Sequence, residues 1–188
     1  AYGVKAEAAG EVVRMVRAAC KKPLMVKLSP QAENIPEMCK AVEAAGADAI
    51  SLTNTFQACA IDLEKRKPVF NNIFAGLSGP AVRPIALRMV WQSAKKVHIP
   101  IIGMGGIETG EDAAAFMLCG AKAVMVGTAV PHFLYRAGGC AQVGRAYLSL
   151  LPHVIKGAGS RQRERLHSLS SVFISVDPWV GPGGRFAR

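Results

Sequence analysis

Apolar residues recur along the first 129 residues with two spacings that alternate. Between residues 6 and 20, apolar side chains such as Val12, Val16 and Ala19 stand three or four positions apart, which is the spacing of one helix face. Pro23 follows, and residues 24–28 then form a short apolar run with a single lysine, typical of a buried strand. The pattern predicts a helix over residues 6–20 and a strand over residues 24–28.

The same alternation occurs three more times before residue 130. It predicts further helices over residues 35–45, 81–96 and 110–119, and further strands over residues 49–53, 99–103 and 123–127. Strands that alternate with helices through short connections form parallel sheets. We therefore expect an α/β fold with four parallel strands whose carboxyl ends lie at one rim.

The connection between the second and third predicted strands, residues 54–80, breaks this rhythm. It shows no regular period and is much longer than the roughly two to six residues usual for such a connection. A long ordered loop at this place in a fold often carries function. The charge run Asp62-Leu63-Glu64-Lys65-Arg66-Lys67 within it is expected on a solvated surface.

Composition changes near residue 130, which suggests two parts. Residues 1–129 form the α/β part, and residues 130–188 form a divergent, basic and partly irregular tail that is rich in Arg, Gly, Ser and Pro. The tail contributes much of the net charge of +10. A non-enzymatic basic binding module is the alternative function that this tail leaves open, but solvated surface charge is the interpretation we favour, and we expect no nucleic-acid partner.

The whole composition excludes other classes of protein. A chain of 188 residues that is 51% hydrophobic can bury one sizeable core. Its apolar runs are far shorter than the roughly 20 residues needed to cross a bilayer, and it begins without an initiator methionine or the layout of a signal peptide, as if entered midway. The five cysteines are widely separated and form no C-x-x-C pair, which predicts a reduced, cytoplasmic protein without a metal site and with most cysteines as small core residues; Cys59 lies in the long connection.

Glycines follow the last two predicted strands. Gly105 and Gly106 come after residues 99–103, and Gly127 and Thr128 come at the end of the next strand. Glycines at strand ends let the backbone approach a ligand, and their N–H groups together with a helix N-terminus bind phosphate. Two such loops in succession are found after the seventh and eighth strands of (β/α)₈ barrels. We interpret the pair as a phosphate site, with simple tight turns as the alternative.

Polar side chains end the first two predicted strands. Lys27 would emerge at the rim, where its ammonium group can stabilise negative charge that develops on a bound ring. Thr53, Asn54 and Thr55 follow the second strand with groups that donate and accept hydrogen bonds, as a planar polar substrate requires. The alternatives are a surface lysine and an Asx turn that opens the long connection.

Several of these segments together resemble the class 1B dihydroorotate dehydrogenases. Six motifs occur in the order and spacing of that family over most of residues 1–129. They are Val26-Lys27-Leu28-Ser29-Pro30, Ala44-Ala45-Gly46-Ala47-Asp48, Thr53-Asn54-Thr55, Gly76-Leu77-Ser78-Gly79-Pro80, Ile101-Ile102-Gly103-Met104-Gly105-Gly106 and Val126-Gly127-Thr128. The resemblance implies that residues 1–129 are the C-terminal half of a (β/α)₈ TIM barrel, with its last four strands.

The resemblance also implies a cofactor, a substrate and their contacts. Lys27, Thr53 and Gly79 would contact the ring system of FMN, and Asn54 and Thr55 would bind orotate or dihydroorotate. The phosphate of FMN would be held by residues of the two glycine loops, namely Gly105, Gly106, Gly127 and Thr128. The reaction implied is the oxidation of dihydroorotate to orotate in pyrimidine biosynthesis. Dihydropyrimidine dehydrogenase, with a related FMN barrel, is the alternative within the same chemistry.

The family's remaining requirements lie outside this sequence. Its catalytic cysteine belongs to a loop after the fourth strand, upstream of Ala1, so we expect no catalytic residue in this chain and no dehydrogenase activity from the chain alone. The resemblance implies two protein partners: a subunit with an iron–sulfur cluster and FAD that passes electrons to NAD, and a second copy in a homodimer.

Overall fold

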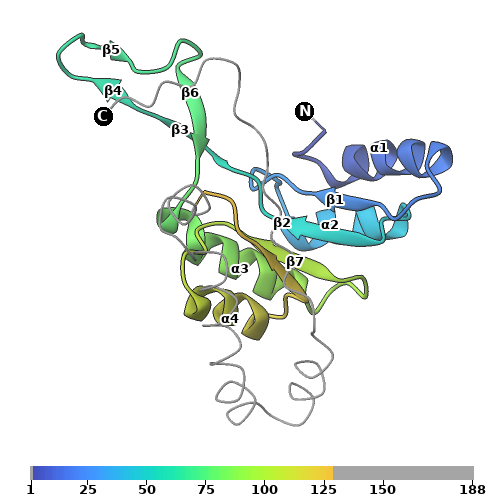
Figure 1. The fold of residues 1–188 in the computed structure, drawn as a ribbon. Coiled ribbons are helices and arrows are strands. Elements are labelled where there is room, and N and C mark those ends of the chain that lie inside the picture. Colours follow the sequence, from blue (N-terminus) through green and yellow to red (C-terminus); the bar gives the residue numbers. More distant parts are fainter. Residues whose placement is uncertain (1, 129–188) are drawn as a thin grey trace.

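The computed structural model describes residues 2–128, and its centre is a four-stranded parallel sheet (Figure 1). The strands are β1 (Met25–Lys27), β2 (Ala49–Leu52), β7 (Ile101–Met104) and β8 (Ala123–Met125), in the order β1-β2-β7-β8. Every neighbouring pair is parallel. The four strands predicted from the sequence are thus confirmed, and their carboxyl ends lie at one edge of the sheet.

Four α-helices connect or precede these strands. They are α1 (Ala6–Ala19), α2 (Ile35–Ala44), α3 (Arg83–Ser93) and α4 (Gly110–Leu118). The side chain of Asn34 caps α2 by accepting a hydrogen bond from Glu37 N, and Thr109 caps α4 in the same way. The helix predicted over residues 81–96 is divided and shorter: a 3₁₀ turn, η1 (Pro80–Val82), precedes α3. Pro84 stands in the first turn of α3, where its missing N–H needs no partner.

The strand order places all the helices on one face of the sheet. The strands follow one another in space as they do in the chain, and crossovers between parallel strands are right-handed, so each helix packs beside the previous one on the same face. The contacts between α1 and α2, between α2 and α3, and between α3 and α4 agree with this. The arrangement is that of one half of a (β/α)₈ barrel, in which helices surround the outer face.

Alternate strand residues build the core between the sheet and the helices. Register puts Val26, Ile50 and Ile101 in one row, and Leu52, Gly103 and Val124 in the next. Most of these side chains are fully buried, together with Met38 and Val42 of α2, Met89 and Val90 of α3 and Phe116 of α4. Gly103 makes room for Phe116, because a Cβ atom at position 103 would lie 3.0 Å from Phe116 Cγ. This close approach packs α4 directly on β7.

The opposite face of the sheet is covered less well by the described residues. Its central row, in register, consists of Lys27, Ser51, Ile102 and Ala123. Met25 and Lys27 are exposed, Ile102 and Ala123 are half-buried, and Ser51 alone is buried. In a closed barrel this face lines the interior, and side chains near its carboxyl ends point toward the active site.

An antiparallel arm rises from the connection between β2 and α3 (Figure 1). Its strands β3 (Phe56–Cys59) and β6 (Phe74–Leu77) pair with each other, and its tip is the short hairpin of β4 (Ile61–Asp62) and β5 (Lys67–Pro68). The sequence predicted only an irregular connection here. The difference arises because the strands have two to four residues each, too few for an alternating pattern to be recognised. The charge run at residues 62–67 is mostly exposed, as expected.

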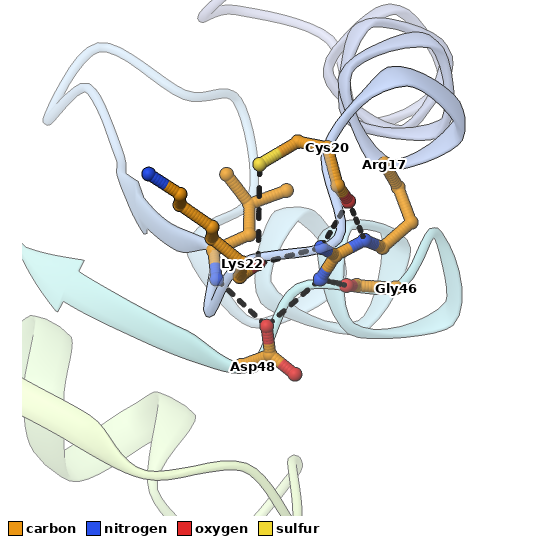
Figure 2. A network of polar contacts seen from close by, with 6 residues as sticks. Arg17, Cys20, Lys22, Gly46 and Asp48 are labelled. Carbon is orange, nitrogen blue, oxygen red and sulfur yellow. Dashed lines mark hydrogen bonds and ion pairs between the residues drawn. The ribbon is translucent and has the colours of Figure 1, made fainter.

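A polar network lies at the amino ends of the strands, opposite the predicted site (Figure 2). Arg17 donates hydrogen bonds to the backbone carbonyls of Cys20, Lys22 and Gly46 and forms an ion pair with Asp48, at 2.8 Å between Nη1 and Oδ2. The same carboxylate oxygen accepts from Leu24 N at 2.7 Å. These contacts fix the end of α1 to the starts of β1 and β2. Active sites of such barrels lie at the opposite, carboxyl ends of the strands, so we assign this network to stability.

The cysteines differ in their surroundings. Cys39 is fully buried, and burial raises the pKa of its thiol to about 11. Cys20 and Cys119 are partly buried, and burial raises the pKa of Cys119 as well. The sequence analysis placed Cys59 in a loop, but it is the last residue of β3, where it is exposed. The prediction of core cysteines is therefore clearest for Cys39.

Some predictions fall on residues that are not described. The tail assigned to residues 130–188, the boundary at residue 129 and Cys140 lie outside residues 2–128. Within the described range, no helix is both long enough and apolar enough to cross a membrane. Residues 2–128 also contain no group of three His, Cys, Asp or Glu side chains that could hold a metal ion.

Candidate functional site at the carboxyl ends of the strands

The parallel sheet brings the predicted site residues to one edge in a fixed order. Lys27 ends β1, Thr53 follows β2, Gly105 follows β7, and Gly127 follows β8 after one intervening residue. Neighbouring strands are about 4.8 Å apart, so the edge from β1 to β8 spans roughly 15 Å. The two polar strand ends therefore lie on one side of this edge, and the two glycine loops lie on the other.

The backbone after β2 is tied to both neighbouring strand ends. Thr53 N donates to Met104 O at 3.1 Å, and Asn54 N donates to Leu28 O at 3.1 Å. The Thr53 side chain is buried, and its hydroxyl lies 3.4 Å from Leu28 O as a donor. The peptide bond between Leu52 and Thr53 is cis. The hydrogen bonds of Thr53 and Asn54 make this segment the fixed floor of the edge.

Asn54 and Thr55 are exposed beyond this floor. Asn54 Oδ1 accepts a hydrogen bond from Thr55 N at 2.9 Å, which orients the side-chain amide. Gly76 of β6 backs on Thr55: a Cβ atom at position 76 would lie 2.8 Å from Thr55 Cβ. The arm therefore holds Thr55 in place from behind, a role that sequence reasoning did not assign to Gly76.

Lys27 lies on the face of the sheet opposite the helices. Its register partner is Ser51, and its side chain is exposed. This is the position expected for a lysine that reaches a ligand at the rim. The sequence prediction that Lys27 emerges at the carboxyl end of β1 agrees with the geometry of the strand.

The first glycine loop has the backbone conformation that only glycine adopts easily. Gly105 and Gly106 have φ values of 122° and 72°. Gly106 also approaches the chain before η1, because a Cβ atom there would lie 2.6 Å from Gly79 O. A side chain at this position would separate the two segments. The loop is therefore packed against the start of α3 as well as against β7.

The second glycine loop is joined to the same region by a hydrogen bond. The Thr128 hydroxyl donates to the Ser78 hydroxyl at 2.9 Å, next to Gly79. Both Gly79 and Gly127 face open space, since a Cβ atom at either position would meet no described atom within 4 Å. Gly79, Gly106 and Thr128 are thus brought together from three different segments.

Three backbone amides of the two loops have no partner outside the helices and strands of residues 2–128. They are the N–H groups of Gly106, Gly127 and Thr128. The N–H of Gly105 lies on the ladder side, because Met104 pairs with Met125 of β8. Gly106 is half-buried, and Gly127 and Thr128 are exposed. Free N–H groups that gather at adjacent strand ends are a feature of anion sites. The N-terminus of α4, capped by Thr109, begins shortly after the first loop.

Comparison with known proteins gives the family. The sequence model of dihydroorotate dehydrogenase matches residues 1–138. The chain belongs to the dihydroorotate dehydrogenase family. Members of this family are flavin-dependent TIM barrels, so the four parallel strands with their outer helices are the C-terminal half of a (β/α)₈ barrel. The fold class predicted from the sequence is confirmed.

Individual relatives agree with the family. The chain is 59% identical over 128 residues to the catalytic subunit of dihydroorotate dehydrogenase B (NAD(+)) from Petrotoga mobilis, 68% of this chain and 43% of the relative. It is 58% identical over 127 residues to the subunit of the same name from Porphyromonas gingivalis, 68% of this chain and 41% of the relative. The chain therefore spans about two fifths of the length of these relatives. The resemblance to the class B enzymes is confirmed for this part.

Sequence reasoning missed three residues that shape the site. Ser78 and Gly76 belong to a motif that the resemblance had quoted without giving either a role. Arg83 was not singled out, although it contacts the carbonyl of Gly106. One local signal could have pointed to the ion-pair partner of Arg83. Thr109 and Asp112 form a capping box, a Ser/Thr followed three residues later by an acid, and this pattern marks the start of α4.

Proposed function

We propose that this chain provides the phosphate half and part of the ring wall of an FMN site in a dihydroorotate dehydrogenase of the class B type. The observation that carries the proposal is the set of three backbone amides after β7 and β8, those of Gly106, Gly127 and Thr128, that have no partner in loops or turns of residues 2–128. In the complete protein the reaction would be the oxidation of dihydroorotate to orotate. Family membership supports the proposed substrate and reaction, and the glycine loops support the phosphate of the proposed cofactor.

The donors present fit a phosphate group. Gly106, Gly127 and Thr128 offer backbone N–H groups, Gly105 lets the backbone turn beside them, and the Thr128 hydroxyl adds a further polar group. Side chains are absent where the ligand would approach, because Gly127 and Gly79 both face open space. A helix N-terminus close to such amides attracts an anion further. We assign the phosphate of FMN to this place.

The polar strand ends would then face the ring and the substrate. FMN supplies the hydride acceptor of the reaction when it is bound. Lys27, Thr53 and Gly79 would contact its ring system, with the Lys27 ammonium stabilising negative charge on the ring. Asn54 and Thr55, which are exposed beside them, would hydrogen-bond the planar orotate ring through amide and hydroxyl groups.

The reaction also needs a general base that removes a proton from the substrate, and we assign this role to no residue of the chain. By resemblance the base is a cysteine that precedes the matched region, and loss of a general base typically costs about 10²- to 10⁴-fold in rate. We therefore propose that the chain alone does not turn over. The proposed partners of the complete protein are a second catalytic subunit and an iron–sulfur and FAD subunit that uses NAD, in keeping with relatives named as NAD(+)-type catalytic subunits.

Titration of the purified chain tests the cofactor assignment. FMN and riboflavin are titrated by quenching of flavin fluorescence, and inorganic phosphate is added as a competitor. We expect weak binding that favours FMN over riboflavin and is weakened by phosphate. Equal affinity for the two flavins would contradict the phosphate site.

A second measurement tests the reaction. Dihydroorotate and an artificial electron acceptor are added to the FMN-loaded chain, with dihydrouracil in a parallel assay. We expect no turnover with either substrate, and we expect orotate rather than uracil to perturb the flavin spectrum. Turnover of dihydroorotate would contradict the proposed inactivity, and a response to uracil alone would favour the dihydropyrimidine dehydrogenase alternative.

A further inference from the structure

An ion pair lies directly behind the first glycine loop. Arg83 Nη1 is 2.8 Å from Asp112 Oδ1 and also donates to the backbone carbonyl of Gly106 at 3.2 Å. Arg83 is the first residue of α3, and Asp112 lies in the first turn of α4. One guanidinium group at the start of α3 therefore contacts both the loop and the first turn of α4, which follows the loop in the chain.

The carboxylate of Asp112 is engaged on both oxygens. Oδ2 accepts hydrogen bonds from Glu108 N and Thr109 N, each at 3.0 Å, while Oδ1 faces Arg83. The Asp112 side chain is only 12% exposed and that of Arg83 is 32% exposed. The segment from Gly106 to Thr109 is thus held at its start by Arg83 and at its end by Asp112. Charge-assisted hydrogen bonds with little exposure hold such a geometry better than surface contacts do.

The contact with Gly106 O constrains the backbone of the loop. A peptide carbonyl and the following N–H belong to one rigid plane, so fixing Gly106 O also fixes Ile107 N, and it restricts rotation of the Gly105–Gly106 segment. Arg83 also packs on Gly106, because a Cβ atom at position 106 would lie 2.9 Å from Arg83 Cβ. Glycines with positive φ have many accessible conformations, and holding one of them in advance reduces the entropy lost on binding.

We propose that Arg83 is a positioning residue for the phosphate loop: with Asp112 it holds Gly105 and Gly106 in the conformation that receives the phosphate, and it does not touch the ligand. This inference rests on the proposed function and adds the residue that preorganises its anion site. The guanidinium charge is already balanced by Asp112, so its effect on an anion comes mainly through the loop conformation.

The structure contains a matched ion pair for comparison. Arg17 and Asp48 also approach to 2.8 Å, and Arg17 also donates to backbone carbonyls (Figure 2). That pair lies at the amino ends of the strands, far from the glycine loops in the fold. Its loss should lower stability and leave the discrimination between FMN and riboflavin unchanged.

The experiment measures phosphate-dependent binding in variants of the chain. FMN and riboflavin are titrated against the wild type, Arg83→Met, Arg83→Lys and the control Arg17→Met. We expect Arg83→Met to weaken FMN binding about tenfold and to leave riboflavin binding within about twofold, as loss of one charge-assisted contact suggests. Arg83→Lys should recover part of the loss, because lysine keeps the charge but not the planar fork. Arg17→Met should keep the wild-type ratio of FMN to riboflavin affinity.

Hydrogen exchange provides a readout that does not depend on the flavin. We expect Arg83→Met to accelerate exchange of the Glu108 and Thr109 amides, which donate to Asp112, and to leave the amides of β1 and β2 unchanged. An equal loss of FMN and riboflavin affinity, or exchange that rises across the whole sheet, would overturn the positioning role and leave a structural one. If the wild type binds both flavins equally, the phosphate site itself fails, and the inference fails with it.

Discussion

Gly76 of β6 lies directly behind Thr55, so that a Cβ atom at position 76 would be 2.8 Å from Thr55 Cβ. Real Cβ atoms essentially never approach this closely, and the neighbour is a branched carbon that cannot swing away as the end of a flexible side chain could. The antiparallel arm therefore determines the position of a residue at the proposed substrate site. The arm can approach Thr55 this closely only because residue 76 has no side chain.

Replacement of Gly76 by alanine should displace Thr55 or the arm. Overpacking of this kind lowers the free energy of unfolding by roughly 1–3 kcal/mol. The pairing of β3 with β6 should be the part that is disturbed. We expect a lower free energy of unfolding in urea and faster hydrogen exchange of the arm amides. The matched control is Gly127→Ala, whose new methyl group meets no described atom within 4 Å and should change stability by less than about 0.5 kcal/mol. Equal effects of the two substitutions would show that Gly76 is not close-packed.

Gly103 offers a second test, in the core. A Cβ atom at position 103 would lie 3.0 Å from Phe116 Cγ, so Gly103→Ala should lower the free energy of unfolding by roughly 1–3 kcal/mol. The double variant with Phe116→Leu should lose less than the sum of the two single variants, because the smaller side chain leaves room for the methyl group. Coupling energies between contacting residues are about 0.5–3 kcal/mol. Strict additivity in urea unfolding would contradict this packing.

The sequence predicted the sheet well because its signals are local. Each strand is a short apolar run next to a helix with regular spacing, and parallel pairing follows from the alternation. The rim residues could be predicted from the same logic, since Lys27 ends a strand and Thr53 and Gly105 directly follow strands. The start of α3 was placed less well, because Pro80 and Pro84 divide one apolar pattern into a 3₁₀ turn and a helix.

The features that sequence reasoning missed depend on contacts between distant residues. The arm pairs Phe56 with Leu77 across two strands of four residues, and such short strands carry little periodicity. Arg83 contacts Gly106, which is 23 positions away, through a side chain whose identity alone gives no hint of its partner. A pattern along the chain records spacing and polarity, whereas these contacts depend on how two helices and a loop pack in three dimensions.

The thiols of Cys39 and Cys59 should differ in reactivity. Thiolate is the reactive form, and burial raises the pKa of Cys39 to about 11, so at pH 8 it is both inaccessible and protonated. Cys59 is exposed on the arm. We expect an alkylating reagent to modify Cys59 within minutes and Cys39 only after the chain unfolds, as followed by peptide mass spectrometry. Rapid modification of native Cys39 would show that the packing between α2 and α3 opens readily.

Acid should weaken the chain through Asp48. Leu24 N donates to this carboxylate and Arg17 does so as well, and these contacts hold the pKa of Asp48 below the usual value of an aspartate. Because the folded-state pKa is lower than the unfolded one, the stabilisation is complete above about pH 4 and is lost as pH falls through the folded-state pKa. Asp48→Asn should lower stability at neutral pH and flatten its decline below pH 4.

The control for this prediction is Asp62→Asn. Hydrogen bonds from Lys65 and Glu64 also lower the pKa of Asp62. Those contacts join residues three and two positions apart, so they can persist in the unfolded chain. The contacts of Asp48 span 24 and 31 positions and are lost on unfolding. Urea unfolding between pH 3 and pH 7 should therefore flatten more in Asp48→Asn than in Asp62→Asn, and the opposite ranking would contradict a stabilising role for the network at the amino ends of the strands.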